Sequence, residues 1–152
     1  MKLVIGALEG KTLDYVIMVC RGYTPEFIDD KHIVFTQQVD EFETDIVNLN
    51  NFNPSTNHTD SIRLFKEMCN SVENELLLSY DRCWDVWEIW LNESGCCVEP
   101  SVMTQHKNMN MSISSAFVRL HLKDYHCNDF VINISDELMK PLQDAQRLGL
   151  YL

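Results

Sequence analysis

The sequence is poor in positive charge. Its 12 lysines and arginines stand against 23 aspartates and glutamates, which gives a formal net charge of −11 at neutral pH. No cluster of lysines and arginines is present of the kind that binds a nucleic-acid backbone, so we expect no direct binding to nucleic acid. A strongly negative chain instead attracts basic partners at long range, although acidity also serves solubility alone.

Long hydrophobic runs are also missing. No stretch of the sequence approaches the roughly 18 apolar residues that a membrane-spanning helix requires. The N-terminal segment MKLVIGALEGK has a short apolar patch that ends at Glu9, which is too short for the apolar region of a secretion signal. We therefore expect no membrane association and a location in the cytoplasm.

Glycine and proline are scarce, with five and four copies, while 45% of the residues are hydrophobic. This composition excludes a low-complexity chain and is typical of a globular protein. A chain of 152 residues is expected to form one domain, spanning residues 1–152, that buries roughly 70% of the surface exposed when it is unfolded.

The usual signatures of metal binding and catalysis are absent from the sequence. Its six cysteines show no C-x2-C spacing, and a zinc site built from Cys96, Cys97 and a histidine would lack the usual ligand pattern. There is no nucleophile elbow, no phosphate-binding glycine loop and no H-E-x-x-H segment. We therefore expect reduced thiols, no metal, no cofactor and no enzymatic activity.

The stretch from Asn53 to Met68 predicts a loop, a helix cap and an amphipathic helix. Pro54 disfavours helical backbone at Asn53, and apolar residues then recur at helical spacing. Between them stand polar residues that favour helix caps: Ser55, Thr56 and Asn57. Capping explains these residues by itself. The alternative is that they bind an anion at the helix start, together with His58.

Segments with helical spacing alternate with short segments rich in β-branched and aromatic residues. Helices are predicted over residues 11–21, 57–70 and 112–124. Strands are predicted over Ile33–Phe35, Glu75–Tyr80 and Cys83–Asn92, with a short one over Phe130–Ile134. Such a pattern indicates the α+β class, as an α/β sandwich with a mostly antiparallel sheet of about four strands and helices packed on it.

Three polar segments are predicted to connect these elements. They are a connection over 23–31, a turn or excursion over 39–50, and an outward loop over 93–111. A loop as long as the third is uncommon and is often functional. Near the C-terminus, residues 138–152 predict a terminal helix with an apolar stripe that Gly149 weakens.

Three tryptophans fall within CWDVWEIWLN. In a strand, Trp84 and Trp90 face one way and Trp87 faces the other, which leaves apolar side chains on both faces. Core packing is the simplest role for tryptophans. Apolar residues on both faces also predict a homodimer, formed through one face of this strand or through the terminal apolar stripe.

Three segments resemble small phage proteins. They are LEGKTLDYVIMVC (Leu8–Cys20), NPSTNHTDSIRLFKEM (Asn53–Met68), and SISSAFVRLHLKDY followed by VINISDEL. In this order they are similar to phage ABA-sandwich domains and to NinX-like phage proteins. The chain departs from that pattern at Asn57, where the family has an acid, at Ser135, where it has proline, and at 126–128, an apparent insertion. The resemblance implies an α/β sandwich and a phage origin, and it supplies no catalytic residue.

The densest acidic patch surrounds one aromatic side chain and comprises Asp40, Glu41, Phe42, Glu43 and Asp45. Carboxylates a few residues apart can imitate successive phosphates. We therefore expect a phage-encoded, non-enzymatic counter-defence inhibitor that binds a host protein or defence complex with a basic, nucleic-acid-reading surface.

The alternative function is an oligomeric sponge that sequesters a small nucleotide-type immune signal. Its ligand would be contacted by the residues of the helix start and by the tryptophans: Ser55, Thr56, Asn57, His58, Trp84, Trp87 and Trp90. The net negative charge opposes the capture of an anionic ligand, which favours the inhibitor.

Overall fold

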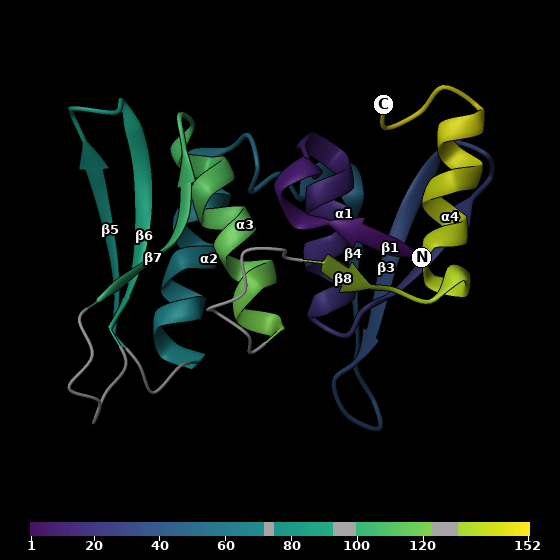
Figure 1. Ribbon diagram of the computed structural model, residues 1–152. Coiled ribbons are helices and arrows are strands. Elements are labelled where there is room, and N and C mark those ends of the chain that lie inside the picture. The colour runs from purple at the N-terminus through teal and green to yellow at the C-terminus, as the bar shows by residue number, and fades with distance from the viewer. Residues whose placement is uncertain (72–74, 93–99, 123–130) are drawn as a thin grey trace. The chain divides into compact units, whose positions relative to one another are not determined.

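The fold is that of an α+β protein. The computed structural model describes residues 1–71, 75–92, 100–122 and 131–152 (Figure 1). Within these ranges lie four α-helices and eight strands, and every strand pair is antiparallel. The predicted class is therefore confirmed. The described strands form three sheets, however, whereas the sequence predicts one sheet of about four strands.

The contacts within the chain form two compact units. Unit 1 consists of Met1–Asn53 and Asp129–Leu152, and unit 2 consists of Pro54–Asn128. Each unit has its own three-stranded sheet and its own pair of α-helices. The chain expected to form a single domain over 1–152 is thus divided internally, with unit 2 inserted between two parts of unit 1.

Five of the described strands belong to unit 1. Its main sheet has the order β2-β3-β4, with β2 at Thr24–Ile28, β3 at His32–Gln38 and β4 at Thr44–Asn48. A second, two-stranded sheet pairs β1 (Lys2–Val4) with β8 (Val131–Asn133). The chain beginning is thereby tied to a segment near the chain end.

The helices of unit 1 enclose an apolar core. The α-helices are α1 (Gly10–Cys20) and α4 (Asp136–Arg147). Unit 1 also contains two short 3-10 helices, η1 (Ile5–Ala7) and η2 (Leu49–Asn51). Tyr15 of α1 packs edge-on against Phe35 of β3, with ring centroids 5.1 Å apart. Both side chains are completely buried, so this aromatic pair is part of the core.

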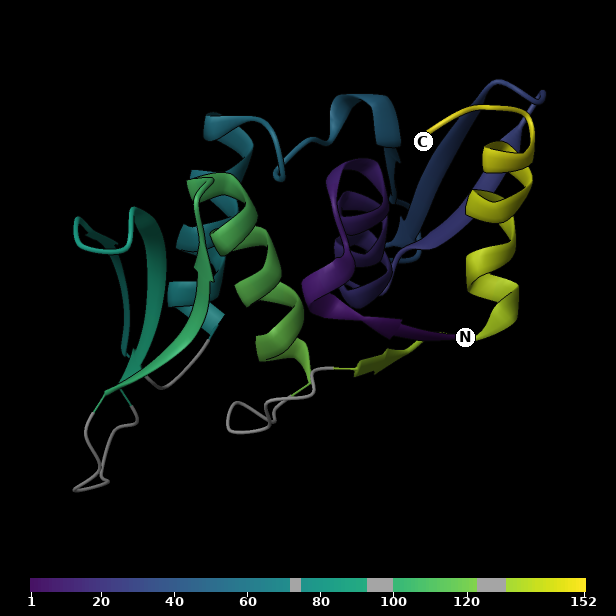
Figure 2. The ribbon, with the colours of Figure 1, turned by 45° about the horizontal axis from the view of Figure 1, so that its top comes forward.

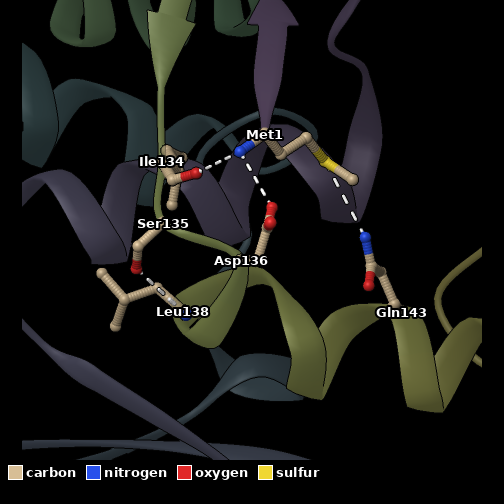
Figure 3. A network of polar contacts seen from close by, with 6 residues as sticks. All are labelled: Met1, Ile134, Ser135, Asp136, Leu138 and Gln143. Atoms are coloured by element: carbon tan, nitrogen blue, oxygen red, sulfur yellow. Dashed lines mark hydrogen bonds and ion pairs between the residues drawn. The ribbon is translucent and has the colours of Figure 1, made fainter.

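The first residue contacts the start of α4 (Figure 3). The Met1 ammonium donates to the Ile134 carbonyl at 2.6 Å and lies 3.0 Å from Oδ1 of Asp136. The Ser135 hydroxyl accepts from the Leu138 amide at 3.3 Å and caps the helix. These contacts fix the direction in which the chain leaves β8 and enters α4.

Unit 2 packs two helices on one side of a sheet. The sheet has the order β5-β6-β7, with β5 at Glu75–Asp81, β6 at Val86–Asn92 and β7 at Ser101–His106. Helices α2 (His58–Ser71) and α3 (Met109–His121) lie side by side along it in both views (Figures 1 and 2). Because the helices cover one side of this sheet, the two faces of its central strand β6 meet different surroundings.

The helix side of β6 is identified by hydrogen bonds. Thr104, the cross-strand neighbour of Ile89, donates its hydroxyl hydrogen to the Ser112 carbonyl of α3 at 2.9 Å. Ile89 is completely buried on this side. Because side chains alternate along a strand, Glu88 and Trp90 project from the opposite face, which we call the outer face.

A polar contact joins α2 to α3. The Asn110 side-chain oxygen accepts from the Ser61 hydroxyl at 2.7 Å and lies 2.8 Å from Nδ1 of His58. Asn110 and Ser61 are both buried. The helix pair is therefore held by matched polar groups as well as by apolar packing.

Three predicted connections contain strands, and those predictions were wrong in part. Strand β2 forms within 23–31, β4 within 39–50 and β7 within 93–111, where α3 also begins. All three are edge strands. An edge strand tolerates polar residues and proline, which weakens its sequence pattern. Residues 93–99 of the predicted loop lie outside the described part of the chain.

The predicted helices are confirmed, with ends shifted by a few residues, but the terminal helix is shorter than predicted. It ends at Arg147 because Gly149 adopts a left-handed backbone with φ of 82°. The Leu150 amide then donates to the Ala145 carbonyl at 3.0 Å. Leu142 and Ala145 of its apolar stripe are buried, whereas Leu148, the third member, is 57% exposed. The predicted dimer stays a prediction.

Candidate functional site

The five acidic-patch residues predicted to contact a partner lie in one hairpin. Strands β3 and β4 pair in register up to Gln38 and Thr44, and residues 39–43 connect them. We call residues 39–45 the hairpin tip. The fold therefore brings the predicted partner-binding residues together on one short loop and the strand that follows it.

Asp40 fixes the shape of the hairpin tip. Its Oδ1 accepts hydrogen bonds from the backbone amides of Phe42, at 2.7 Å, and Glu43, at 2.8 Å. The Val39 amide closes the turn by donating to the Glu43 carbonyl at 2.9 Å. An aspartate in this role holds a turn in one conformation, so the tip is preorganised.

Phe42 projects from this ordered turn into solvent. Its side chain is 96% exposed, the highest value among the exposed large hydrophobic residues of the described chain. Val39 and Ile46, on either side of it in sequence, are also exposed. An exposed apolar group on a fixed backbone is typical of a contact surface, because it gains free energy only when a partner covers it.

The four carboxylates of the hairpin tip are not equivalent. Asp40 is engaged with the turn, and Asp45 accepts a hydrogen bond from the Tyr23 hydroxyl and is half-buried. Glu41 and Glu43 are exposed. The tip therefore presents two glutamates to solvent beside Phe42, while Asp40 holds the turn and Asp45 binds the Tyr23 hydroxyl.

The polar residues at the start of α2 take part in local structure. The Asn57 side chain accepts from the Asp60 amide at 3.1 Å, which confirms its predicted capping role. Ser55 is buried, Thr56 is exposed, and the His58 ring contacts Asn110. Binding of an anion by these residues stays a prediction.

The three tryptophans do not form one ligand wall. Trp84 lies in the turn before β6 and is exposed, although the sequence predicts it within the strand. Trp87 lies on the helix side, with its ring 5.2 Å from that of Tyr80. Trp90 lies on the outer face, where its indole nitrogen donates to Oε2 of Glu88 at 2.8 Å. A single pocket lined by all three side chains is inconsistent with these positions.

Ser61, His58 and Asn110 lie together without the geometry of a catalytic triad. The Ser61 hydroxyl donates to the Asn110 amide oxygen rather than to the imidazole, and the serine is completely buried. A nucleophilic serine instead requires an adjacent base and access to substrate. This contact therefore serves to join α2 to α3.

Metal and thiol chemistry receive no support from the described residues. Within those ranges, no group of three or more His, Cys, Asp or Glu side chains is placed to hold a metal ion. Cys96 and Cys97 lie outside the described part of the chain. Burial raises the pKa of Cys20 to about 12, so its thiol is protonated near neutral pH and is a weak nucleophile.

No helix in the described ranges has the length and apolar character needed to cross a bilayer. The longest described α-helix, α2, spans His58–Ser71 and carries charged residues along its exposed side. A transmembrane helix needs about 20 mainly apolar residues.

Sequence reasoning missed Glu88 and Asn110. Glu88 is buried on the outer face, where it accepts from Trp90 and, at 2.7 Å, from the Gln105 amide. Its signal is the single acid within VWEIWLN, since a charge in an apolar strand needs hydrogen-bond partners. The sequence does not indicate the role of Asn110, because this residue falls in the segment 93–111 that is predicted as a polar loop.

The proposed kinship to small phage proteins rests on three short segments. The resemblance implies a helix in the first segment and in the third, and the structure has α1 and α3 at these places. Helical structure at these positions does not identify a family, so the kinship stays a prediction. No protein-family model matches the chain, and a search of curated proteins finds no match.

Proposed function

We propose that this chain is a non-enzymatic binding protein that recognises a basic protein surface through its hairpin tip. The observation that carries this proposal is the side chain of Phe42, 96% exposed on a turn that Asp40 holds in place. Glu41 and Glu43 stand on either side of it and are exposed. An apolar anchor with a negative rim complements an apolar pocket with a positive rim.

The anchor supplies most of the binding free energy in this proposal. Complete burial of a phenylalanine side chain is worth about 1.5–3 kcal/mol. The preformed turn reduces the conformational entropy lost on binding. The two glutamates contribute less to affinity, since exposed ion pairs are worth about 0.2–1 kcal/mol each, but they steer the encounter and disfavour acidic partners.

The proposal extends to a biological role. We take the partner to be a host protein or defence complex in the cytoplasm whose basic surface reads nucleic acid, and the chain to be a phage counter-defence inhibitor. The net charge of −11 supports a basic partner. The resemblance to small phage proteins supports the phage context.

A matched pair of substitutions tests this role for Phe42. The Phe42→Ser variant removes the anchor, and Leu148→Ser removes another exposed apolar side chain, at the end of α4. Wild type and both variants are immobilised and used to capture proteins from bacterial lysate, which are quantified by mass spectrometry. We expect a basic protein that the wild type and Leu148→Ser retain and that Phe42→Ser loses by at least about tenfold.

Two results would contradict the proposal. One is an identical set of captured proteins for the wild type and Phe42→Ser. The other is a set lost equally in both variants, because then any exposed apolar residue would serve and the hairpin tip would have no special role. Circular dichroism of each variant checks that folding is unchanged.

A further inference from the structure

The outer face of the β5–β6–β7 sheet carries an apolar row. Leu77, Trp90 and Val102 are direct cross-strand neighbours on the three strands, since a register shift between the Ile89 and Trp90 pairs brings Val102 opposite Trp90 although Thr104 lies on the helix side. Leu77 is 57% exposed, Val102 is exposed and Trp90 is half-buried. Both helices of unit 2 pack on the other side, so this row is open to solvent.

A cavity adjoins one end of this row. It has a volume of about 620 Å³ and is lined by Glu75, Leu77, Trp90, Asn92 and Pro100. Leu77, Pro100 and the indole supply apolar walls, Asn92 supplies an amide, and Glu75 supplies a carboxylate. Among the described residues that line the cavity there is no lysine or arginine to pair with the Glu75 carboxylate.

Glu88 prepares the indole of Trp90 for a cation. Its buried carboxylate accepts the indole N–H at 2.8 Å and also the Gln105 amide at 2.7 Å. The hydrogen bond fixes the orientation of the ring. It also polarises the indole toward greater negative charge on its face, which is the part of the ring that attracts cations.

We infer that this cavity, here called the Trp90 cavity, binds the cationic side chain of a basic peptide, with arginine as the best fit. The planar guanidinium stacks on the Trp90 face and pairs with Glu75, while its aliphatic stem lies on Leu77 and Pro100. The carboxylates of Glu75 and Glu88 disfavour an anionic occupant. This inference goes beyond the proposed function, because the cavity belongs to unit 2 and the hairpin tip to unit 1.

A pair of peptides isolates the effect of charge. N-acetyl-Gly-Arg-Gly-amide and its citrulline counterpart have nearly the same shape, but citrulline is neutral. Each is titrated into the ¹⁵N-labelled full chain, and the indole N–H signal of Trp90 is followed by NMR after assignment with Trp90→Phe. We expect the arginine peptide to move this signal with a dissociation constant of about 1 mM, and citrulline to bind at least about fivefold more weakly.

Substitutions then locate the site. Glu75→Gln, at an exposed position, should weaken arginine binding about two- to fivefold and leave citrulline unchanged. Trp90→Leu should weaken it by at least about tenfold, followed through the backbone signals of β5 and β6. The control Glu41→Gln removes one carboxylate of the hairpin tip and should change nothing. Unchanged arginine binding in Glu41→Gln would show that the peptide binds at the Trp90 cavity and not at the hairpin tip of the proposed function.

Three results would overturn the inference. The first is no movement of the Trp90 signal up to about 10 mM arginine peptide, which is well above the expected dissociation constant. The second is equal binding of the citrulline peptide, which would show apolar packing alone. The third is a loss in Glu41→Gln as large as that in Glu75→Gln, which would show only general attraction to a negative chain. If the hairpin tip has no partner, these outcomes are unaffected.

Discussion

Unit 1 and unit 2 both pack two helices against a three-stranded antiparallel sheet, but they join them differently. Unit 1 uses apolar contacts such as the pair Tyr15 and Phe35, both completely buried. Unit 2 also has an apolar core, and it adds hydrogen bonds between buried polar side chains, among them Asn110 with Ser61. Of the eight buried polar or charged residues in the described chain, all but Asp14 belong to unit 2.

This difference bears on stability and specificity. Apolar packing tolerates small shifts, whereas a buried hydrogen bond is favourable only in one arrangement and is costly when broken. We therefore expect the core of unit 1 to supply more stabilisation per residue. The helices of unit 2 should be fixed in register by their polar partners, which keeps the outer face and the Trp90 cavity in a defined shape.

The largest expected effect is in the core of unit 1. Phe35→Ala removes a completely buried ring and its contact with Tyr15, so we expect a loss of about 3–5 kcal/mol in the free energy of unfolding. Chemical denaturation followed by circular dichroism measures it. A loss below about 1 kcal/mol would show that the core closes around the deletion, against the close packing described for unit 1.

A smaller loss is expected in the polar contact of unit 2. Asn110→Ala removes the acceptor of the buried Ser61 hydroxyl on α3 but leaves the His58 carbonyl of α2 within reach at 3.1 Å, so we expect a loss of about 0.5–1.5 kcal/mol. The double variant with Ser61→Ala should cost less than the sum of the two single changes, because the groups act as a pair. Strict additivity would contradict the claim that they join α2 to α3.

Alkaline pH should weaken unit 1. Burial raises the pKa of Cys20 to about 12, from an ordinary value of 9.0, and also raises that of Tyr15. A raised pKa means that the folded state holds the proton more tightly than the unfolded state. The contribution of the Cys20 thiol to the free energy of unfolding is therefore fully present below pH 9 and is lost as pH rises toward 12. Unfolding midpoints measured across this range test the sign. Rising stability would contradict it.

Thiol labelling gives a local control for the same effect. At pH 8, iodoacetamide should modify Cys20 far more slowly than the exposed Cys83, because little thiolate is present on Cys20 and its access is restricted. Mass spectrometry of peptides from samples quenched over time measures both rates. Equal rates would show that Cys20 is more open than its burial indicates.

The smallest expected effect is at the hairpin tip. Asp40→Ala removes the acceptor of two backbone amides and should cost about 0.5–1 kcal/mol or less in global stability, since the tip is exposed. Hydrogen exchange at the amides of Phe42 and Glu43 should nevertheless become faster. Unchanged exchange at these amides would show that the turn keeps its shape without Asp40.

The helices and the central strands were predictable because their apolar residues follow clear periods. The apolar residues of α2 recur at helical spacing, and those of β3 and β6 form β-rich runs. The edge strands β2, β4 and β7 were missed because an edge position tolerates proline and polar residues, whereas β5, also at an edge, was predicted from its apolar run. In β2, for example, Pro25 and Glu26 resemble a loop in sequence.

The candidate sites were predictable only in part. The hairpin tip could be identified because its residues are consecutive, but the separate tasks of Asp40 and Glu41 depend on the turn geometry. The Trp90 cavity could not be identified, since it joins Glu75 of β5 to Trp90 of β6 through strand register. Register depends on the whole sheet rather than on any local pattern.

The measurement that tests the central claim most directly is the salt dependence of association with the basic protein captured by wild type. Surface plasmon resonance compares wild type with the double variant Glu41→Gln and Glu43→Gln, and with Phe42→Ser. We expect the double variant to associate more slowly with a shallower salt dependence, and Phe42→Ser mainly to dissociate faster. Equal association rates, salt dependence and dissociation rates in all three proteins would contradict recognition through the hairpin tip.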